Sequence, residues 1–405
     1  MRLFFINRFY APDFSATAQM LTDVAEGLAA RGRDVRVITS RLMYEDPGRR
    51  LPPREVIAGV QVIRVGTTRF GRAGLAGRAI DYLTFYISCA FCILHHVRRG
   101  DIIVTKTDPP LLAVVANAAA RLKGAKAVNW LQDIFPEVAS RLGLRVAGPP
   151  VSTLLVWLRN RTLRSAARTV VIGARMHEYV EGLGAPPDRI VDIPNFCDDA
   201  AIRPCPAEAN PLRRAWNFDP GHFVIGYSGN LGRAHDLDTL LGAADALRDM
   251  PDIKFLFIGG NSLRSRVERA ASELNLTSVM CQPYQPREAL AESLSVPDVH
   301  WVSLRPELEG LIVPSKIYGI AAAGRPVLMI GHPDGDIGRL LSRHGFGCTV
   351  AIGAAETLAA RILSWRNNRE EVQRLGERAR RFIDDHARRD LAVGKWDALV
   401  SELSV

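Results

Sequence analysis

Short runs of apolar, often β-branched residues alternate with longer segments of helical repeat along the first half of the chain. In the segment 15–31 apolar residues recur at helical spacing, and Gly32 follows the last of them, which predicts a helix. This alternation is typical of a parallel sheet whose strands are joined by crossover helices. The runs predicted as strands are 3–7, 35–39, 60–65, 102–105, 127–130 and 169–172.

A second series of the same kind follows a segment containing proline and aspartate, residues 194–211. Its predicted strands are 224–228, 254–258, 278–281, 300–303 and 327–330. The predicted fold class is therefore α/β, with two Rossmann-like domains whose parallel sheets face a cleft. We expect the domains at residues 1–200 and 201–385, and the basic helical segment 386–405 is placed to cross back to the first domain.

The segment 79–97 is the most apolar helix candidate, but its uninterrupted apolar part is shorter than the roughly 20 residues that span a bilayer. We therefore do not expect a transmembrane helix. Two interpretations stay open: an interfacial membrane anchor with basic flanks, and a buried crossover helix. The basic flanks are Arg69, Arg72, Arg78, His95, His96, Arg98 and Arg99.

The chain has 405 residues, 47% hydrophobic and 23% charged, which indicates an ordinary globular protein with about two or three domains. Its formal net charge of +9 is compatible with nucleic acid, an anionic membrane surface or phosphate-bearing ligands. The basic residues are dispersed and no recognised motif interleaves them with aromatic residues, so we do not expect nucleic-acid binding.

Six scattered cysteines, with no secretory signal before the first predicted strand, favour a reduced, cytoplasmic protein. Cys89 and Cys92 form a C-x-x-C pair, but it lies in the apolar segment without a second pair. Packing within a helix is therefore preferred over a metal or redox role, and no metal site is predicted.

A glycine-containing loop, residues 227–236, joins a predicted strand to a predicted helix at the start of the second domain. Its glycines allow a ligand to approach the backbone closely, and its basic side chains can donate to phosphate oxygens. A tight strand-to-helix turn is the alternative interpretation. The candidate donor-binding residues here are Gly229, Asn230, Gly232, Arg233 and His235.

A second phosphate candidate is the segment 313–319, which leads into a predicted helix. Ser315 can cap that helix, and Lys316 can supply a positive charge to a leaving diphosphate. The alternative is a solvated surface lysine. We prefer the binding role because Arg233 and Lys316 would both lie at carboxyl ends of strands in one sheet, where open α/β folds bind ligands.

Two loops of the first domain carry the candidate acceptor-binding residues. The loop 7–17 opens the first predicted helix and supplies Tyr10, Ser15 and Thr17, although Ser15 could simply be a helix N-cap. It has no G-x-G-x-x-G, which argues against an NAD-dependent dehydrogenase. In the second loop, Asp133 could accept a hydrogen bond or a proton from a sugar hydroxyl. The alternatives are an N-cap for Asp133 and a first-turn acid for Glu137.

In this order along the chain, these motifs resemble the family 4 glycosyltransferases, in the branch of bacterial N-acetylfucosamine and colanic-acid-type polysaccharide transferases. The resemblance covers nearly the whole chain. It rests on Tyr10-x-Pro12 with Ser15-Ala16-Thr17, Gln132-Asp133-x-x-Pro136-Glu137, Ile193-Pro194-Asn195, and the segments 227–232 and 313–318.

The resemblance implies a GT-B fold, with the acceptor in the first domain and the nucleotide sugar in the second. It implies transfer with retention of anomeric configuration, without a bound metal or other cofactor and without a carboxylate nucleophile. Arg233 and Lys316 would then stabilise the leaving diphosphate, and the residues around Gln282 and Tyr284 would lie against the base. Together with Asp133, these two cations are the predicted catalytic residues.

One departure from the family concerns the ribose site. Many members carry two glutamates separated by seven residues, the second of which binds the ribose, and the corresponding positions here are Leu311 and Gly319. Glu309, just before this loop, is a hypothetical partial substitute that would reach a sugar hydroxyl.

We therefore expect transfer of a hexose or N-acetylaminosugar, from a UDP-linked donor, to a polyprenyl-diphosphate-linked glycan during surface polysaccharide synthesis. The expected location is the cytoplasmic face of the inner membrane, as a peripheral protein. A nucleotide-sugar 2-epimerase shares the fold plan but needs cleft acids and histidines that we cannot place. The other alternative is a catalytically inactive nucleotide-sugar- or glycan-binding protein.

Overall fold

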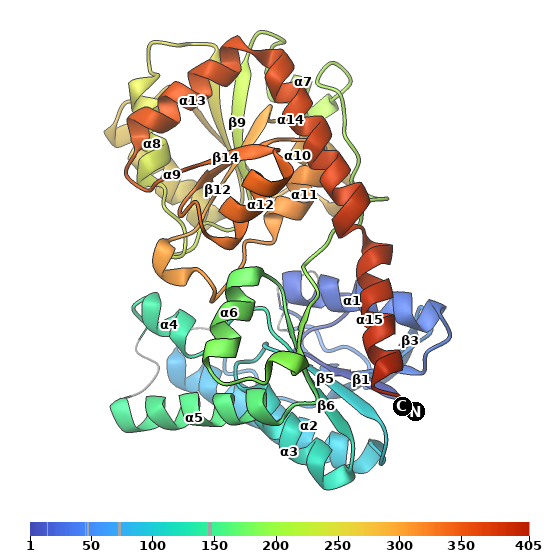
Figure 1. The fold of residues 1–405 in the computed structure, drawn as a ribbon. Helices are drawn as coiled ribbons and strands as arrows, with labels where there is room; N and C mark the ends of the chain where they lie inside the picture. Colours follow the sequence, from blue (N-terminus) through green and yellow to red (C-terminus); the bar gives the residue numbers. More distant parts are fainter. Residues whose placement is uncertain (14, 45, 47, 72–73, 145–147, 405) are drawn as a thin grey trace. The chain divides into compact units, whose positions relative to one another are not determined.

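The computed structural model describes residues 1–13, 15–44, 46, 48–71, 74–144 and 148–404. Phe14 of the first loop and Arg72 of the basic flank lie outside the described residues. The chain divides into two compact units (Figure 1). Unit 1 comprises Met1–Asn195, Gly310–Ile312 and Arg389–Val405, and unit 2 comprises Phe196–Glu309 and Val313–Arg388. The break between them thus follows Asn195, where residue 200 was expected.

Unit 1 is built on an eight-stranded sheet with the order β3-β4-β2-β1-β5-β6-β7-β8. Its strands run parallel to their neighbours, except that β3 pairs with β4 in the antiparallel direction. The strands are β1 (Leu3–Ile6), β2 (Val35–Ser40), β3 (Arg54–Ile57), β4 (Val60–Val65), β5 (Ile102–Lys106), β6 (Lys126–Trp130), β7 (Arg168–Val171) and β8 (Ile190–Asp192).

The six strands predicted for the first domain are confirmed, and β3 and β8 were not predicted. β3 has the sequence REVI, in which no residue is fully buried, so it lacks the apolar run that marks an interior strand. β8 has only three residues and follows a 3₁₀ turn. Both strands lie at the ends of the sheet, where burial on both faces is not required.

Helices cover both faces of this sheet. On one face α2 and α3 pack against side chains such as Phe4 and Ile6, and α5 lies beside α3. On the other face, Phe5 contacts Trp396 of α15, which packs along α1 (Figure 1). The helices are α1 (Ala16–Ala30), α2 (Leu75–His96), α3 (Leu112–Lys123), α4 (Glu137–Arg141), α5 (Pro149–Ser165), α6 (Ala174–Gly182), the 3₁₀ turn η1 (Pro187–Arg189) and α15 (Arg389–Glu402).

The apolar segment 79–97 forms α2; its packing on the sheet supports the crossover-helix interpretation, and the interfacial anchor stays a prediction. Its inner face is buried against the sheet through residues such as Phe85, Cys89 and Ile93. Its outer face is exposed and apolar. By length and composition the stretch Ala76–His96 could cross a membrane, with a mean hydropathy of 1.3, so its length does not support the expectation of no transmembrane helix, which stays a prediction. Because its inner face packs on the sheet, the helix is nevertheless part of the folded unit.

Unit 2 is built on a six-stranded parallel sheet with the order β11-β10-β9-β12-β13-β14. The five predicted strands are confirmed, and only β14, with the half-buried sequence GCTV, was missed. The strands are β9 (Phe223–Ser228), β10 (Ile253–Ile258), β11 (Val279–Gln282), β12 (Val299–Ser303), β13 (Val327–Ile330) and β14 (Gly347–Val350).

The helices of unit 2 surround this sheet, whose core is rich in aromatic residues such as Phe223, Tyr227 and Trp301. They are α7 (Pro211–Ala215), α8 (Asp238–Ala246), α9 (Asn261–Glu273), η2 (Arg287–Ala289), α10 (Leu290–Ser295), η3 (Pro306–Leu308), α11 (Lys316–Ala322), α12 (Asp336–His344), α13 (Ala355–Asn367), α14 (Arg369–Phe382) and the π-helical turn η4 (Ile383–Ala387).

The C-terminal helical segment is interrupted where it passes from unit 2 to unit 1. After η4, Arg388 has extended dihedrals (φ −70°, ψ 151°), and α15 then begins. Within unit 1, α15 inserts Trp396 against Trp130, with ring centroids 4.6 Å apart, and Arg33 pairs with Asp397 at 2.7 Å. The last helix is therefore an integral part of the first unit.

Candidate active site

In unit 2 the glycine loop and the start of α11 meet at the carboxyl edge of the sheet. Gly229 follows β9 with a φ of +125°, which side chains rarely adopt, and a Cβ there would lie 2.9 Å from Lys316 Nζ. Only glycine allows this approach of the loop to the lysine. The structure thus brings together two predicted residues that are far apart in the sequence.

Lys316 is held over the loop by an aromatic neighbour. Its Nζ donates to Tyr227 Oη at 2.5 Å and lies 3.9 Å from the centroid of the same ring. The Tyr227 hydroxyl in turn donates to the Asn230 carbonyl at 2.7 Å. A buried tyrosine needs a partner for its hydroxyl, and here that partner is the loop itself.

Burial lowers the pKa of Lys316 to about 7. Without a ligand the amine is therefore close to the point where it loses its charge. An anion at this position would stabilise the ammonium form and raise the pKa again. A lysine with a pKa near neutrality can stabilise a diphosphate whose negative charge grows as the bond between the sugar and the diphosphate breaks.

His235 is neutral in this site, which changes the role expected for it. Its Nδ1 lies 2.7 Å from the Ser303 carbonyl, so Nδ1 carries the proton and donates it there. Burial, helped by the charge of Lys316, lowers its pKa to about 4. In this tautomer Nε2 accepts, so His235 suits a sugar or ribose hydroxyl rather than a phosphate oxygen.

The remaining donor-side residues lie around this edge. Arg233 is exposed on the same loop, two residues before His235, and Gly232 precedes it. Gln282 is the last residue of β11, and Tyr284 is 54% exposed just beyond it. A Cβ on Gly260 would lie 3.2 Å from the Tyr284 ring, so this ring stands over the end of β10. An exposed ring in that position can stack on a nucleotide base.

Two predictions about the start of α11 and its flank change with the structure. Ser315 occupies the N-cap position, but its side chain makes no capping hydrogen bond, so that predicted contact is wrong. Glu309 accepts a hydrogen bond from the Asp336 amide at 3.1 Å, at the beginning of α12. The Glu309 carboxylate therefore binds the N-terminus of α12, where a negative charge is stabilised.

The missing glutamate position has an apolar environment in this chain. A Cβ on Gly319 would lie 3.3 Å from Leu294 Cδ1 and 3.8 Å from Ile202 Cδ1. A carboxylate side chain at this position would start against these two residues. Glycine therefore fits the apolar surroundings of this position. A contact with the ribose would have to come from another residue.

In unit 1 the carboxyl edge of the sheet carries acidic groups and a buried lysine. Lys106 is 1% exposed, donates to the Thr17 carbonyl at 3.1 Å and lies 3.8 Å from the Trp130 ring centroid. Burial lowers the pKa of Lys106 to about 7 and raises that of Asp108 to about 6. Burial also raises the pKa of Asp133, against a hydrogen bond from Thr107.

Asp133 has an oxygen to offer to a ligand. Among the described residues no hydrogen-bond partner is found for its buried Oδ1, and the same holds for the Tyr10 hydroxyl. The N-cap alternative for Asp133 is wrong, because α4 begins at Glu137 with Pro136 in the cap position. A carboxylate oxygen without a protein partner is suited to accept a hydroxyl of an acceptor sugar.

The other acceptor-side predictions take mainly structural roles. Ser15 is at the N-cap position of α1, where its amide donates to Asp13 Oδ1 at 2.8 Å and its side chain makes no capping bond. Glu137 is the first-turn acid of α4, as one alternative proposed, and pairs with Arg159. Thr17 contributes its carbonyl to Lys106.

Three polar residues of this edge were not predicted: Arg8, Lys106 and Asp108. The Arg8 amide donates to the Asp108 carbonyl at 2.8 Å, and its guanidinium lies 5.0 Å from the Tyr82 ring centroid. The signal was present in the sequence, since Lys106 and Asp108 directly follow the apolar run 102–105 at the carboxyl end of a predicted strand.

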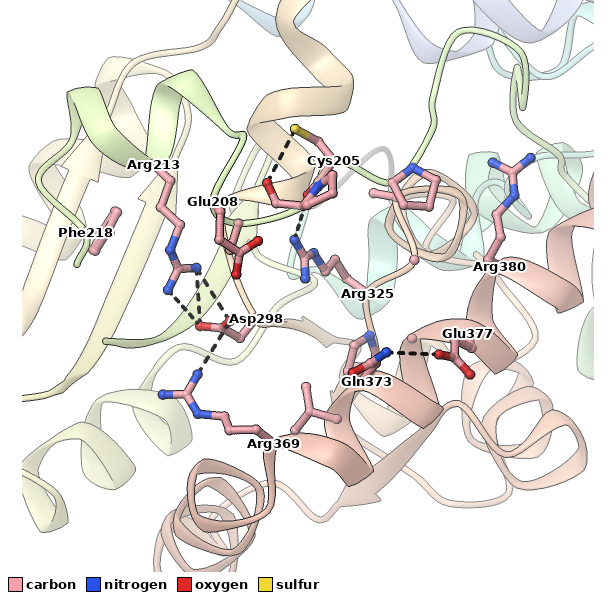
Figure 2. Close-up of a pocket in the computed structure, with 18 of the residues that line it drawn as sticks. Cys205, Glu208, Arg213, Phe218, Asp298, Arg325, Arg369, Gln373, Glu377 and Arg380 are labelled. Carbon is pink, nitrogen blue, oxygen red and sulfur yellow. Dashed lines mark hydrogen bonds and ion pairs between the residues drawn. The ribbon is translucent and has the colours of Figure 1, made fainter. Parts of the chain in front are cut away.

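A separate cavity of about 1720 Å³ lies at the opposite edge of the unit 2 sheet. Figure 2 shows Asp298, which precedes β12, between the guanidinium groups of Arg213 and Arg369. Arg325, which precedes β13, donates to the carbonyls of Cys205 at 3.1 Å and Ser295 at 2.6 Å. Arg325 thus ties Cys205, in the segment 194–211, to the rest of the unit. Open α/β sheets bind ligands at the other edge, so we do not place the donor here.

No group of three or more His, Cys, Asp or Glu side chains that could hold a metal is found among the described residues. The expectation of a reaction without metal or cofactor stays a prediction. Cys89 and Cys92 are free and buried on the inner part of α2.

Two Rossmann-like units in one chain, with polar groups at the carboxyl edge of each sheet, define the GT-B class of folds. Residues 15–195 match the glycosyl transferase 4-like domain, and residues 209–382 match the glycosyl transferases group 1. Because these matches together span both units, the chain belongs to the family 4 glycosyltransferases and is an enzyme of that kind.

Individual relatives agree with this assignment. The chain is similar to the putative colanic acid biosynthesis glycosyl transferase WcaI of Escherichia coli strain K12, with 26% identity over 373 residues, 87% of this chain and 89% of that protein. Its fold is similar to a sucrose-phosphate synthase from Thermosynechococcus elongatus, with a TM-score of 0.78, 18% identity, and 100% and 99% of the two chains covered. Anabaena Alr3699/HepE, solved with UDP-glucose, gives a TM-score of 0.73 at 14% identity, covering 99% and 100%.

Proposed function

We propose that this glycosyltransferase moves a hexose or N-acetylaminosugar, with retention, from a UDP-linked donor to a lipid-linked glycan in surface polysaccharide synthesis. The product would be an O-antigen, capsule or exopolysaccharide, made at the cytoplasmic face of the inner membrane. The observation that carries the proposal is Lys316, held by Tyr227 above Gly229 at the carboxyl edge of unit 2.

In this proposal Lys316 stabilises the charge that develops on the departing diphosphate. The amine is already oriented by the Tyr227 hydroxyl, so little rearrangement is needed when the bond breaks. Arg233, on the same loop, adds a second cation, and His235 accepts from a hydroxyl of the donor. Tyr284 stacks on the base. Asp133 of unit 1 accepts the proton or hydrogen bond of the attacking hydroxyl.

The choice of UDP and of a surface glycan draws on the relatives. HepE was solved with UDP-glucose, and the name of WcaI refers to colanic acid biosynthesis. Neither resemblance selects the sugar, because specificity depends on a few loop side chains. The choice of a lipid-linked acceptor draws on the exposed apolar face of α2.

The test is a panel of UDP-, GDP-, dTDP- and ADP-sugars against the thermal stability of the protein. A ligand at 100 times its Kd adds roughly 2.7 kcal/mol to the free energy of unfolding. We expect stabilisation by UDP-sugars that is lost in Lys316→Ala. Stabilisation by another nucleotide class alone would contradict the choice of UDP.

The alternative of an inactive nucleotide-sugar-binding protein rests on Gly319 in place of the family's glutamate, and the family assignment argues against it. Donor turnover separates the two. Release of UDP from a labelled donor, with sugar transferred to water or to a lipid-linked acceptor, supports the enzyme. Stabilisation by the donor without any release over many hours supports the binding protein.

A further inference from the structure

The outer face of α2 is an unbroken stripe of exposed apolar side chains. Five residues spaced three or four apart share this face, and Phe91 is the most exposed of them at 70%. Soluble proteins rarely leave such a row of large apolar residues in contact with water. The stripe consists of Ile80, Leu83, Ile87, Phe91 and Leu94.

The two helices beside α2 extend this surface. α3 lies next to both α2 and α5, so the three helices form one layer on the sheet (Figure 1). α3 exposes Leu122 at its end, and α5 exposes Val151, Leu154 and Trp157. None of these four residues stood out in the sequence. We call the exposed side of α2, α3 and α5 the three-helix face.

The charges on the three-helix face have one sign. Asp81 is the one acidic residue in the three helices, and it is buried, accepting hydrogen bonds from Thr68 and from the Phe70 amide. By contrast, α1 and α15 on the opposite face of the sheet carry five acids between them. The exposed basic residues on or next to the three-helix face are Arg78, Arg98, Arg99, Arg121, Arg161 and Arg164.

We propose that the three-helix face is a docking surface for an anionic lipid bilayer. The apolar residues enter the interfacial region, and the arginines contact the lipid phosphates. Trp157, with Arg161 at 5.7 Å from its ring centroid, combines both features, since tryptophan favours the membrane interface. α2 lies in the plane of the membrane rather than across it, because Phe85, Cys89 and Ile93 hold its other side in the core.

This surface connects to the acceptor-side residues through the first turns of α2. Arg8, two residues after β1, has its guanidinium 3.8 Å from the Asp81 carboxylate and 5.0 Å from the Tyr82 ring centroid, and its amide donates to the Asp108 carbonyl. The N-terminal part of the stripe is thus close to the carboxyl edge that carries Asp108. A lipid-linked acceptor could then reach that edge from the bilayer, a step that rests on the proposed function.

The test is flotation of the full chain with phosphatidylcholine vesicles that contain 0% or about 30% phosphatidylglycerol. We expect binding to the anionic vesicles, reduced several-fold but not abolished at high salt. Ile87→Glu combined with Phe91→Glu should reduce binding at least tenfold. Arg121→Glu combined with Arg161→Glu should reduce it on anionic vesicles only. Leu274→Glu, at an exposed leucine of unit 2, is the matched control and should bind as the parent does.

The proposal is overturned if the Ile87→Glu, Phe91→Glu variant is folded, as judged by its melting temperature, and still floats with the vesicles. It is also overturned if this variant loses self-association, seen by sedimentation, while vesicle binding is absent in the parent. The donor panel on the same variants keeps the two proposals apart. A protein that floats but is not stabilised by any nucleotide sugar contradicts the proposed function and leaves the docking surface standing.

Discussion

In unit 2 the carboxyl edge of the sheet presents Lys316 above a glycine loop, whereas in unit 1 the same edge presents Asp108 and Asp133. Cations bind the oxygens of a diphosphate, and carboxylates accept from sugar hydroxyls. The carboxyl edge of unit 2 therefore presents a cation to its ligand, whereas that of unit 1 presents carboxylates beside the buried Lys106. The comparison teaches that a substitution in one unit should disturb one ligand and leave the other alone, and each prediction below tests that separation.

The largest effect is expected for Lys316→Ala. Removing one preorganised donor to a developing anion lowers kcat by about 10²–10³-fold. We expect a loss of that size in kcat/KM for transfer from the donor. The measurement is release of UDP from the preferred donor. Lys395→Ala, at an exposed lysine of α15, is the control and should retain full activity. Equal losses of kcat/KM in both variants would contradict a specific role of Lys316 in stabilising the leaving diphosphate.

The corresponding change in unit 1 is Asp133→Asn, which keeps the size of the side chain and removes its charge. General acid–base groups contribute about 10²–10⁴-fold, and we expect the low end because the asparagine amide can still accept a hydrogen bond from the hydroxyl. Transfer should fall about 10²-fold while the donor Kd stays within twofold. Calorimetric titration with the donor provides that Kd. A weakened donor Kd would break the proposed separation between the units.

The pH dependence of donor binding sharpens the comparison. The pKa of Lys316 is about 7 in the free protein, and a bound diphosphate raises it. Affinity from the ammonium is therefore fully present below pH 7 and is lost as the pH rises from 7 toward the pKa of the complex. We expect the Kd to rise roughly tenfold per pH unit in that range. Lys316→Arg, whose guanidinium does not titrate there, should flatten the curve.

The smallest effect is expected for Gly229→Ala. The φ of +125° is strained for alanine, and its Cβ would press on Lys316 Nζ at 2.9 Å. We expect a loss of about 1–2 kcal/mol in the free energy of unfolding, together with a weaker donor Kd. Chemical denaturation measures the first quantity. Gly221→Ala, where a Cβ would meet no atom within 4 Å, is the control and should change neither.

The strands were predictable because most of them are continuous apolar runs buried on both faces. β4 and β13 have the predicted bounds, 60–65 and 327–330. β3 and β14 were missed because their residues are half-buried or exposed and do not form such a run. The local pattern therefore identifies interior strands and fails at the edges of a sheet.

Only those parts of the site that lie within one local motif could be predicted from the sequence. Gly229 and Lys316 stand in recognisable loops, but the contact of Lys316 with Tyr227 joins residues that are 89 apart in the chain. The tautomer of His235 depends on the carbonyl of Ser303, which is 68 residues away. The sequence places Lys106 and Asp108 at the end of a predicted strand, but the burial that shifts their pKa values is visible only in the structure. Distances across the sheet, rather than residue types, decide these roles.

Calorimetric titration of UDP-sugars into the parent protein, Lys316→Ala and Asp133→Asn tests most directly whether the nucleotide sugar binds in unit 2. We expect saturable binding to the parent, binding lost or weakened at least tenfold in Lys316→Ala, and unchanged binding in Asp133→Asn. Donor binding that is indifferent to Lys316→Ala, or that disappears with Asp133→Asn, would contradict the assignment of the nucleotide sugar to unit 2.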